Sequence, residues 1–351
     1  MKKINIEISN NPTCYDIIIT ENSISEINNF IPNKSNYSKF VLLFDSNIDS
    51  KTIDTFKAAF NNIICISVNC DSNNKKSFEL FLDIQKKLIE YNIDRDSLIL
   101  SLGGGTIGDL VGFVASTYKR GIDYIQIPTT LLAMLDSSIG GKTGIDSKAG
   151  KNLIGTFYHP KLVFIDTFFL STLQKEEITS GVFEAIKYGV ALDLDLFSFI
   201  KTNQNNIYDI AVLKKIIELC CQIKTNIITK DERDEGIRNK LNFGHTIGHA
   251  IESLYGIRHG EAVAFGMICA AYISKNCNTI DKKELDQIIK LITYFDLPRV
   301  SFECEKILEY ILRDKKQKKG KNNFILLNGI GNSYISSDIE KNLIKDSILS
   351  L

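Results

Sequence analysis

The sequence has no tryptophan, only three methionines, five prolines and four histidines in 351 residues. It also has no net charge, because 42 basic residues equal 42 acidic ones, so no overall field would attract the chain to nucleic acid. No apolar stretch reaches the roughly 18 residues needed to span a bilayer. The first residues, Met1–Ile8, alternate polar and apolar side chains and lack the apolar run of a signal peptide. We therefore expect a cytoplasmic protein that binds neither nucleic acid nor membrane.

The eight cysteines are scattered and form no Cys-x-x-Cys pair. This pattern predicts reduced, mostly buried thiols in an intracellular protein, and it excludes a disulfide framework. A chain of this length can form two packed domains.

The first half of the chain alternates between strand and helix patterns. Lys3–Ile8 and Tyr15–Thr20 alternate like the two strands of a hairpin. Phe40–Phe44, Ser97–Leu102 and Ile122–Ile127 are short apolar runs of the kind found in buried parallel strands. The pattern predicts an α/β amino-terminal domain, residues 1–170, with a mostly parallel sheet.

The second half, residues 171–351, has a different texture. No proline occurs between Pro160 and Pro298. We expect a mainly α-helical domain, with a ligand cleft between the two halves. Long amphipathic stretches lie near Gln174–Leu192, Val212–Lys230, Asn242–Tyr255, Glu261–Asn276 and Leu285–Phe295.

Three of the four histidines, His245, His249 and His259, fall within fifteen residues. Neutral imidazole is the commonest nitrogen ligand for zinc and also carries protons near neutral pH. The cluster therefore suggests a divalent metal. The simpler alternative is that His245 and His249, four residues apart, only share one helix face.

A glycine-rich turn follows the strand Ser97–Leu102. Glycines at 103, 105 and 108 match the spacing G-x-G-x-x-G, and a helical pattern follows them. Such a turn lets the backbone approach a pyrophosphate at the amino terminus of a helix. A tight strand-to-helix turn without a ligand is the alternative. The turn lies far into the chain and lacks an acidic residue at the usual spacing, so a nicotinamide site would not be in the standard first βαβ unit.

Gly140–Gly144 resembles a nucleotide phosphate loop, but the full spacing is absent because Asp136 stands five residues before Gly141. This disfavours a nucleoside triphosphate. We expect a small, flexible, polar segment that grips a small phosphorylated ligand through Lys142, Lys151 and Asn152. Solvated loop lysines are the alternative, which we accept for Lys148.

Taken together, these motifs resemble the 3-dehydroquinate synthase family, a group of sugar phosphate cyclases, from about Phe40 to Ile330. The matching segments are Gly103–Asp109, Tyr118–Gly121, Pro128–Leu132, Asp136–Thr143, Gly150–Asn152, Ser180–Gly189, Asn242–Ala250 and His259–Val263.

The resemblance implies a Rossmann-like amino-terminal domain, a helical carboxy-terminal domain and a homodimer. It implies NAD and a divalent metal, Zn²⁺ or Co²⁺, as cofactors. The implied substrate is a phosphorylated sugar acid, DAHP, which becomes 3-dehydroquinate and phosphate in the shikimate pathway of aromatic amino acid biosynthesis. The implied steps are oxidation of an alcohol, elimination of phosphate, re-reduction, ring opening and aldol closure.

By the same resemblance, Glu184, His245 and His259 would bind the metal. Arg120 would reach the substrate phosphate from the partner subunit, and Lys315 or Lys316 would cover it. Lys224 and Arg238 would pair with the carboxylate, while Asp136 and Lys187 would bind ring hydroxyls. The remaining phosphate contacts would be Lys142, Asn152, Asn242 and His249. The NAD contacts would be Asp45, Lys76, Gly104, Gly105, Thr106, Asp109, Thr129, Thr130, Leu132, Lys142, Lys151, Phe169 and Thr172. One departure is Asn73, where the family commonly has a glutamate near the adenosine.

Three alternatives stay open. A metal-dependent polyol or alcohol dehydrogenase would share the glycine-rich turn and a histidine-bound metal, but it needs no phosphate and carboxylate partners. Another sugar phosphate cyclase would alter the pair Lys224 and Arg238. A non-enzymatic module would bind zinc and NAD without releasing phosphate.

Overall fold

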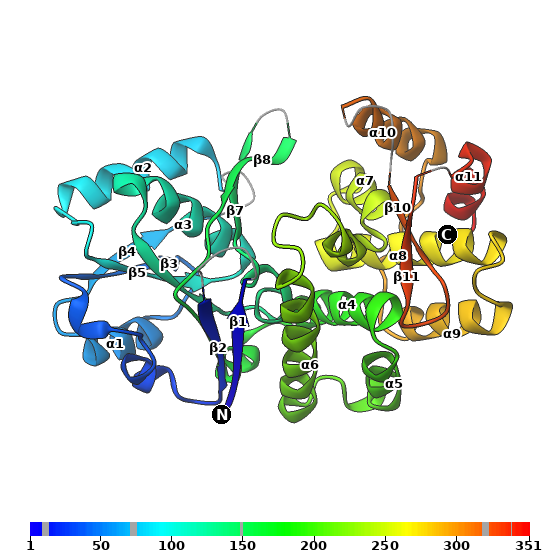
Figure 1. Ribbon diagram of the computed structural model, residues 1–351. Coiled ribbons are helices and arrows are strands. Elements are labelled where there is room, and N and C mark those ends of the chain that lie inside the picture. The colour runs from blue at the N-terminus through cyan, green and yellow to red at the C-terminus, as the bar shows by residue number, and fades with distance from the viewer. Residues whose placement is uncertain (9–13, 71–75, 148–149, 318–322, 338) are drawn as a thin grey trace. The chain divides into compact units, whose positions relative to one another are not determined.

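The computed structural model describes residues 1–8, 14–70, 76–147, 150–317, 323–337 and 339–351, and for 313–317 it describes the backbone only. The chain divides into two compact units (Figure 1). Unit 1 contains Met1–Gln174 together with Lys224–Glu232, and unit 2 contains Lys175–Ile223 together with Arg233–Leu351. The predicted boundary at 170/171 did not include the return of Lys224–Glu232 to unit 1.

Unit 1 is built on a seven-stranded sheet with the strand order β1-β2-β9-β6-β5-β3-β4. Its first two strands form the antiparallel hairpin expected at the amino terminus, and all the other pairs are parallel, which confirms the predicted α/β class. The strands are β1 (Lys2–Glu7), β2 (Cys14–Thr20), β3 (Phe40–Asp45), β4 (Ile64–Val68), β5 (Leu98–Gly103), β6 (Asp123–Pro128) and β9 (Leu162–Asp166).

Helices cover both faces of this sheet. α2 (Phe78–Glu90) and α3 (Gly105–Thr117) lie on one face, and α1 (Ser50–Ala59) lies on the other (Figure 1). α2 begins where the Ser77 hydroxyl accepts the Leu80 N–H at 3.1 Å. Its apolar stripe buries Ile84 and Leu88 in the same core as α3 and the strands.

A flexible segment was predicted from Asp136 to Asn152, but its described residues include the end of a π-helical turn (Ala133–Ser137) and strands of a hairpin formed by β7 (Lys142–Ser147) and β8 (Gly150–Phe157). Glycines permit this pairing, because a Cβ at Gly155 would lie 2.1 Å from the Thr143 carbonyl oxygen. The hydroxyl of Thr143 also donates to the Thr156 carbonyl at 3.0 Å. The polar composition of this segment is typical of a loop. The contacts that make it a hairpin join β7 to β8, so they are not visible in the local sequence. Lys148 lies outside the described residues.

Unit 2 is mainly helical, as predicted, with one small hairpin of β10 (Phe324–Leu327) and β11 (Ser333–Ser336). α8 is buried along most of its length and packs against α4, α7, α9 and α11. The helices are α4 (Lys175–Leu192), α5 (Leu194–Thr202), α6 (Ile210–Ile228), α7 (His245–Tyr255), α8 (His259–Asn276), α9 (Lys282–Thr293), α10 (Cys304–Gln317) and α11 (Lys341–Leu349).

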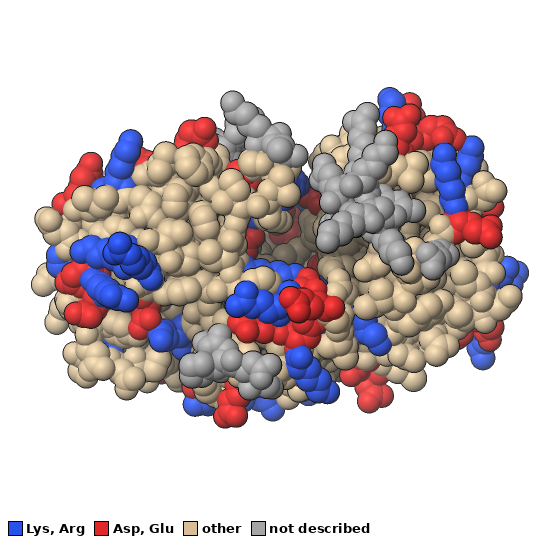
Figure 2. Space-filling view, turned by 45° about the horizontal axis from the view of Figure 1, so that its top comes forward, with Lys and Arg blue, Asp and Glu red and all other residues tan. Residues whose placement is uncertain are grey.

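None of the eight cysteines forms a disulfide, as expected, but the prediction that most are buried is wrong. Only Cys220, Cys221 and Cys269 are buried, and Cys14 is exposed. Over the described part of the chain, no helix combines the length and the apolar character of a membrane span. On the face shown in Figure 2, acidic and basic side chains are interspersed.

Candidate active site

The residues proposed to bind a metal come from three helices of unit 2 that approach closely at glycines. α4 carries Glu184, α7 begins at His245, and α8 begins at His259. A Cβ at Gly260 would lie 2.2 Å from the Ser180 carbonyl oxygen of α4. A Cβ at Gly266 would lie 1.9 Å from the Gly244 carbonyl oxygen just before α7. Larger residues at either glycine would push the helices apart, so these positions bring the three side chains together.

Glu184 is the centre of this cluster. Its side chain is 1% exposed, and its Oε1 lies 3.1 Å from Nε2 of His259 and 3.7 Å from Nε2 of His245. Its other oxygen, Oε2, lies 2.6 Å from Nζ of Lys187, one turn along α4, whose side chain is 2% exposed. A buried carboxylate is therefore surrounded by two imidazoles and one ammonium group.

The electrostatics of the cluster favour positive charge beside Glu184. Burial alone would raise the pKa of Glu184, but Lys187, His245 and His259 hold that pKa well below its usual range. Burial, followed by the charge of Lys187, lowers the pKa of His245 well below its usual value, so this imidazole is neutral and has a free lone pair. Burial alone would lower the pKa of His259, yet hydrogen bonds with Glu184 and Glu252 raise it to about 10. The same negative charge would stabilise a metal dication at this point.

The donor set fits a divalent metal such as zinc. Ligands about 2.0–2.2 Å from a tetrahedral zinc ion lie about 3.3–3.6 Å from each other. The two distances from Glu184 to the histidines, 3.1 and 3.7 Å, bracket that range. A second set overlaps it, because potential ligand atoms of His245, His249 and His259 all lie within 4.8 Å of one another.

Glu252 is a further candidate site residue that the sequence did not indicate. Its carboxylate lies 3.0 Å from Nδ1 of His259, so it fixes the imidazole with Nε2 directed at Glu184. Metal-bound histidines usually donate their second nitrogen to a carboxylate in this way. The sequence does place Glu252 seven residues after His245, which is two turns along the same helix and could have indicated that both side chains lie on one face.

We expect Glu252→Gln to weaken zinc binding about 10- to 100-fold, because loss of the carboxylate partner frees the His259 ring and lowers its basicity. Competition with a chelator would measure the affinity. Glu261→Gln, which alters a carboxylate in the first turn of α8 instead, is the matched control. Equal zinc affinity in Glu252→Gln and the unmodified protein would remove Glu252 from the site.

In unit 1, several residues proposed to bind NAD lie at the carboxyl ends of neighbouring parallel strands. Asp45 ends β3, Gly103 ends β5, and Thr129 follows β6. The register pairs Gly103 with Pro128, and the Thr129 N–H donates to the Gly103 carbonyl at 3.0 Å. The strand order reverses between β3 and β5, which is where ligands bind in open α/β sheets.

The glycine-rich turn forms a cradle at the start of α3. A Cβ at Gly104 would lie 3.1 Å from Thr130, and one at Gly105 would lie 2.6 Å from Ser137. Gly104 caps the helix without a side-chain bond, so the first N–H groups of a 13-residue helix remain available to an anion. Beside the cradle, Nζ of Lys76 lies 2.7 Å from Asp109 and also donates to Asn152. These features fit a dinucleotide pyrophosphate.

The structure also brings Asp136 and Lys224 together, although 88 positions separate them. Nζ of Lys224 donates to the Asp136 carbonyl oxygen at 2.7 Å and to its carboxylate. Lys142 and Lys151 are exposed on β7 and β8. Thr106 lies in the first turn of α3, and Leu132 directly precedes the π-helical turn. Phe169 is buried, and Thr172 is exposed three residues later.

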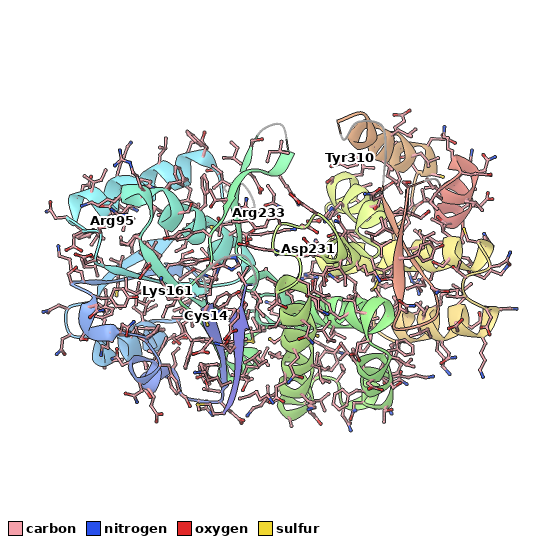
Figure 3. All side chains as sticks on the ribbon, in the orientation of Figure 1. Cys14, Arg95, Lys161, Asp231, Arg233 and Tyr310 are labelled. Atoms are coloured by element: carbon pink, nitrogen blue, oxygen red, sulfur yellow. The ribbon has the colours of Figure 1, made fainter. Side chains whose placement is uncertain are left out.

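The remaining residues predicted for the substrate site lie in unit 2, in a cavity of unit 1 or outside the described part of the chain. In unit 2, the buried Arg238 and the partly buried Asn242 lie on the 3-10 helix before α7, and His249 is exposed on α7. Arg120 lines a cavity of about 670 Å³ in unit 1, together with Arg95 and Lys161. Figure 3 labels Arg95 and Lys161. Asn73 and the side chains of Lys315 and Lys316 lie outside the described part of the chain.

Comparison with known proteins agrees with this arrangement. A solved structure of 2-deoxy-scyllo-inosose synthase, complexed with carbaglucose-6-phosphate, NAD⁺ and Co²⁺, superposes with a TM-score of 0.89 at 26% identity over 99% of both chains. The fold is therefore that of a sugar phosphate cyclase.

Sequence relatives narrow this class. The 3-dehydroquinate synthase of Thermoanaerobacter pseudethanolicus (strain ATCC 33223 / 39E) is 46% identical over 277 residues, 77% of this chain and 78% of that protein. The 3-dehydroquinate synthase of Shewanella pealeana (strain ATCC 700345 / ANG-SQ1) is 38% identical over 347 residues, 95% and 96% of the two chains. Family models for the 3-dehydroquinate synthase N-terminal and C-terminal parts match residues 66–180 and 181–317. The chain belongs to the 3-dehydroquinate synthase family, which confirms the resemblance found in its motifs and disfavours the dehydrogenase alternative.

Proposed function

We propose that this chain converts DAHP into 3-dehydroquinate and inorganic phosphate, with NAD bound by unit 1 and one divalent metal, zinc or cobalt, bound by Glu184, His245 and His259. The observation that carries the proposal is the convergence of these three side chains beside Lys187 in a member of this family. Metal and NAD in the solved 2-deoxy-scyllo-inosose synthase support the choice of cofactors.

Charge favours Glu184 over His249 as the third ligand. Glu184 is buried, and a buried carboxylate needs a cation close by. His249 is exposed, so it does not place a buried charge in the cluster. A set of two nitrogens and one oxygen also leaves a position for substrate oxygens, as a catalytic metal requires. In this arrangement His249 would contact the substrate phosphate.

Each group of residues has a separate task in the proposed reaction. A bound divalent metal would act as a Lewis acid on the substrate alcohol while NAD accepts hydride. Lys187, held 2.6 Å from Glu184, would bind a ring hydroxyl, and Asp136 another. Lys142, Asn152, Asn242 and His249 would offset the phosphate charge as it leaves. Lys224 and Arg238 would pair with the substrate carboxylate.

The test is incubation of the purified protein with DAHP, NAD and zinc, followed by measurement of inorganic phosphate and 3-dehydroquinate. We expect both products in equal amounts, with no net consumption of NAD because the hydride returns to the substrate. Omitting NAD, or removing metal with a chelator and restoring it, is the control. Binding of zinc and NAD without phosphate release would contradict the proposal.

We also propose that the protein works as a homodimer in which Arg120 serves the phosphate of the partner's substrate. Arg120 is exposed and lines the unit-1 cavity with two other basic side chains, Arg95 and Lys161. Mixing an Arg120→Ala variant with a metal-site variant should restore activity if Arg120 acts across subunits. No recovery would argue against that role.

Arg238→Ala should raise the KM for DAHP about 10- to 150-fold, because a charge-assisted hydrogen bond contributes about 1.5–3 kcal/mol. Steady-state kinetics would measure the change. Arg299→Ala, which removes a guanidinium outside the proposed site, is the control and should leave KM unchanged. An unchanged KM in Arg238→Ala would remove this residue from the substrate site.

A further inference from the structure

His159, the one histidine outside the metal cluster, lies beneath the turn at Gly140 and Gly141. A Cβ at Gly141, where φ is +68°, would lie 2.8–3.0 Å from three atoms of the His159 ring. The side chain of His159 is 3% exposed, and the centroid of its ring lies 5.6 Å from that of the Tyr15 ring. The Tyr15 hydroxyl in turn accepts the Gly140 N–H at 3.1 Å. His159 and Tyr15 therefore form a floor under the turn that leads into Lys142.

The same imidazole contacts a second segment. Its Nε2 lies 2.9 Å from Oε1 of Glu232, whose side chain is 14% exposed. Glu232 ends the segment Lys224–Glu232, which belongs to unit 1, and Asp231 beside it is labelled in Figure 3. Because Glu232 is a carboxylate, the imidazole N–H donates and the carboxylate oxygen accepts.

Lys224–Glu232 is thus attached to unit 1 by a charged residue at each end. Lys224 bonds to Asp136, before the glycine turn, and Glu232 contacts His159, under it. The two contacts fix the segment relative to the chain from Asp136 to Lys142. This stretch and this segment carry three of the proposed substrate ligands: Asp136, Lys142 and Lys224.

We propose that His159 and Glu232 are positioning residues that hold Lys142 and Lys224 in one fixed arrangement, so that the phosphate and the carboxylate of one substrate molecule are bound together. The proposal rests on the proposed function, because it takes these two lysines as substrate ligands. In this proposal neither His159 nor Glu232 is itself a substrate ligand. Their effect is on geometry, and misplacement of binding groups by about 1 Å can change rates about 100-fold.

The test compares three variants. His159→Phe keeps a ring beneath Gly141 but cannot donate to Glu232, and Glu232→Met keeps the length of the side chain but cannot accept. We expect each to raise the KM for DAHP about 10- to 100-fold with a smaller change in kcat. His159→Gln, whose amide can donate to Glu232, should stay within a fewfold of the unmodified protein. Zinc affinity should be unchanged in all three.

The double variant tests whether the two residues act through each other. His159→Phe with Glu232→Met should be no worse than the more affected single variant, since one contact is lost only once. Asp54→Asn, which removes an exposed ion pair with Lys57 in unit 1, is the control. Additive effects in the double variant, or an unchanged KM in folded Glu232→Met, would overturn the inference. Absence of phosphate release by the unmodified protein would instead contradict the proposed function.

Discussion

Replacement of His259 by alanine should lower the rate of phosphate release at least about 100- to 1000-fold. The residue supplies Nε2 at 3.1 Å from Glu184 and would be one of three metal ligands. Lewis-acid stabilisation contributes several kcal/mol, and each 1.36 kcal/mol changes a rate about tenfold. Zinc content after dialysis and the rate of phosphate release would be measured on the same sample.

His249→Ala provides a close control, because the three histidine rings lie together, with centroids 5.0–5.8 Å apart. If Glu184, His245 and His259 bind the metal, His249→Ala should keep its zinc while KM for DAHP rises. If His249→Ala loses zinc and Glu184→Gln retains it, the metal is bound by His245, His249 and His259 instead. The circular dichroism spectrum should be the same for all variants.

Lys187→Met should abolish phosphate release and destabilise the metal-free protein by up to about 3–5 kcal/mol. Glu184 and Lys187 form an ion pair whose side chains are 1% and 2% exposed, and removal of Lys187 leaves the buried carboxylate with His259, 3.1 Å away, as its remaining positive partner. A bound dication would compensate for that charge. The loss in the free energy of unfolding should therefore be much smaller with saturating zinc than with EDTA.

Denaturant unfolding with zinc and with EDTA would measure both values. Lys57→Met, which removes a lysine from an exposed ion pair, is the control and should change stability by no more than about 0.5 kcal/mol. Near-normal turnover of Lys187→Met would count against the proposed site. An equal loss of stability in both buffers would mean that no cation takes the place of Lys187 beside Glu184.

Local features of the site could be predicted from the sequence because neighbouring residues determine them. The apolar run of β5, the three glycines and the apolar spacing of α3 are contiguous, and the structure contains the expected strand, turn and helix there. The spacing of His245 and His249 likewise places them on one helix, α7. Resemblance to a family added Glu184, which spacing along the chain could not have related to His259.

Other features depend on contacts between distant segments. Glu252 faces His259 because α7 and α8 pack closely at glycines. Lys224 bonds to Asp136 because residues 224–232 return to unit 1. A flexible segment was expected where β7 and β8 form a hairpin, because its polar residues show no strand pattern. The close approach of the two backbones at Gly144 and Gly155 becomes visible only in the structure.

The sequence alone determined the α/β and helical halves, the glycine-rich turn and the types of residue available for metal, phosphate and carboxylate. Periodicity and composition act over a few residues, and these features need nothing more. Only the tertiary structure decided that Glu184 is surrounded by two imidazoles and Lys187, and that residues 224–232 return to unit 1. It also decided that His159 supports the turn before Lys142. Those outcomes follow from the close packing of segments far apart in the chain, which no local pattern encodes.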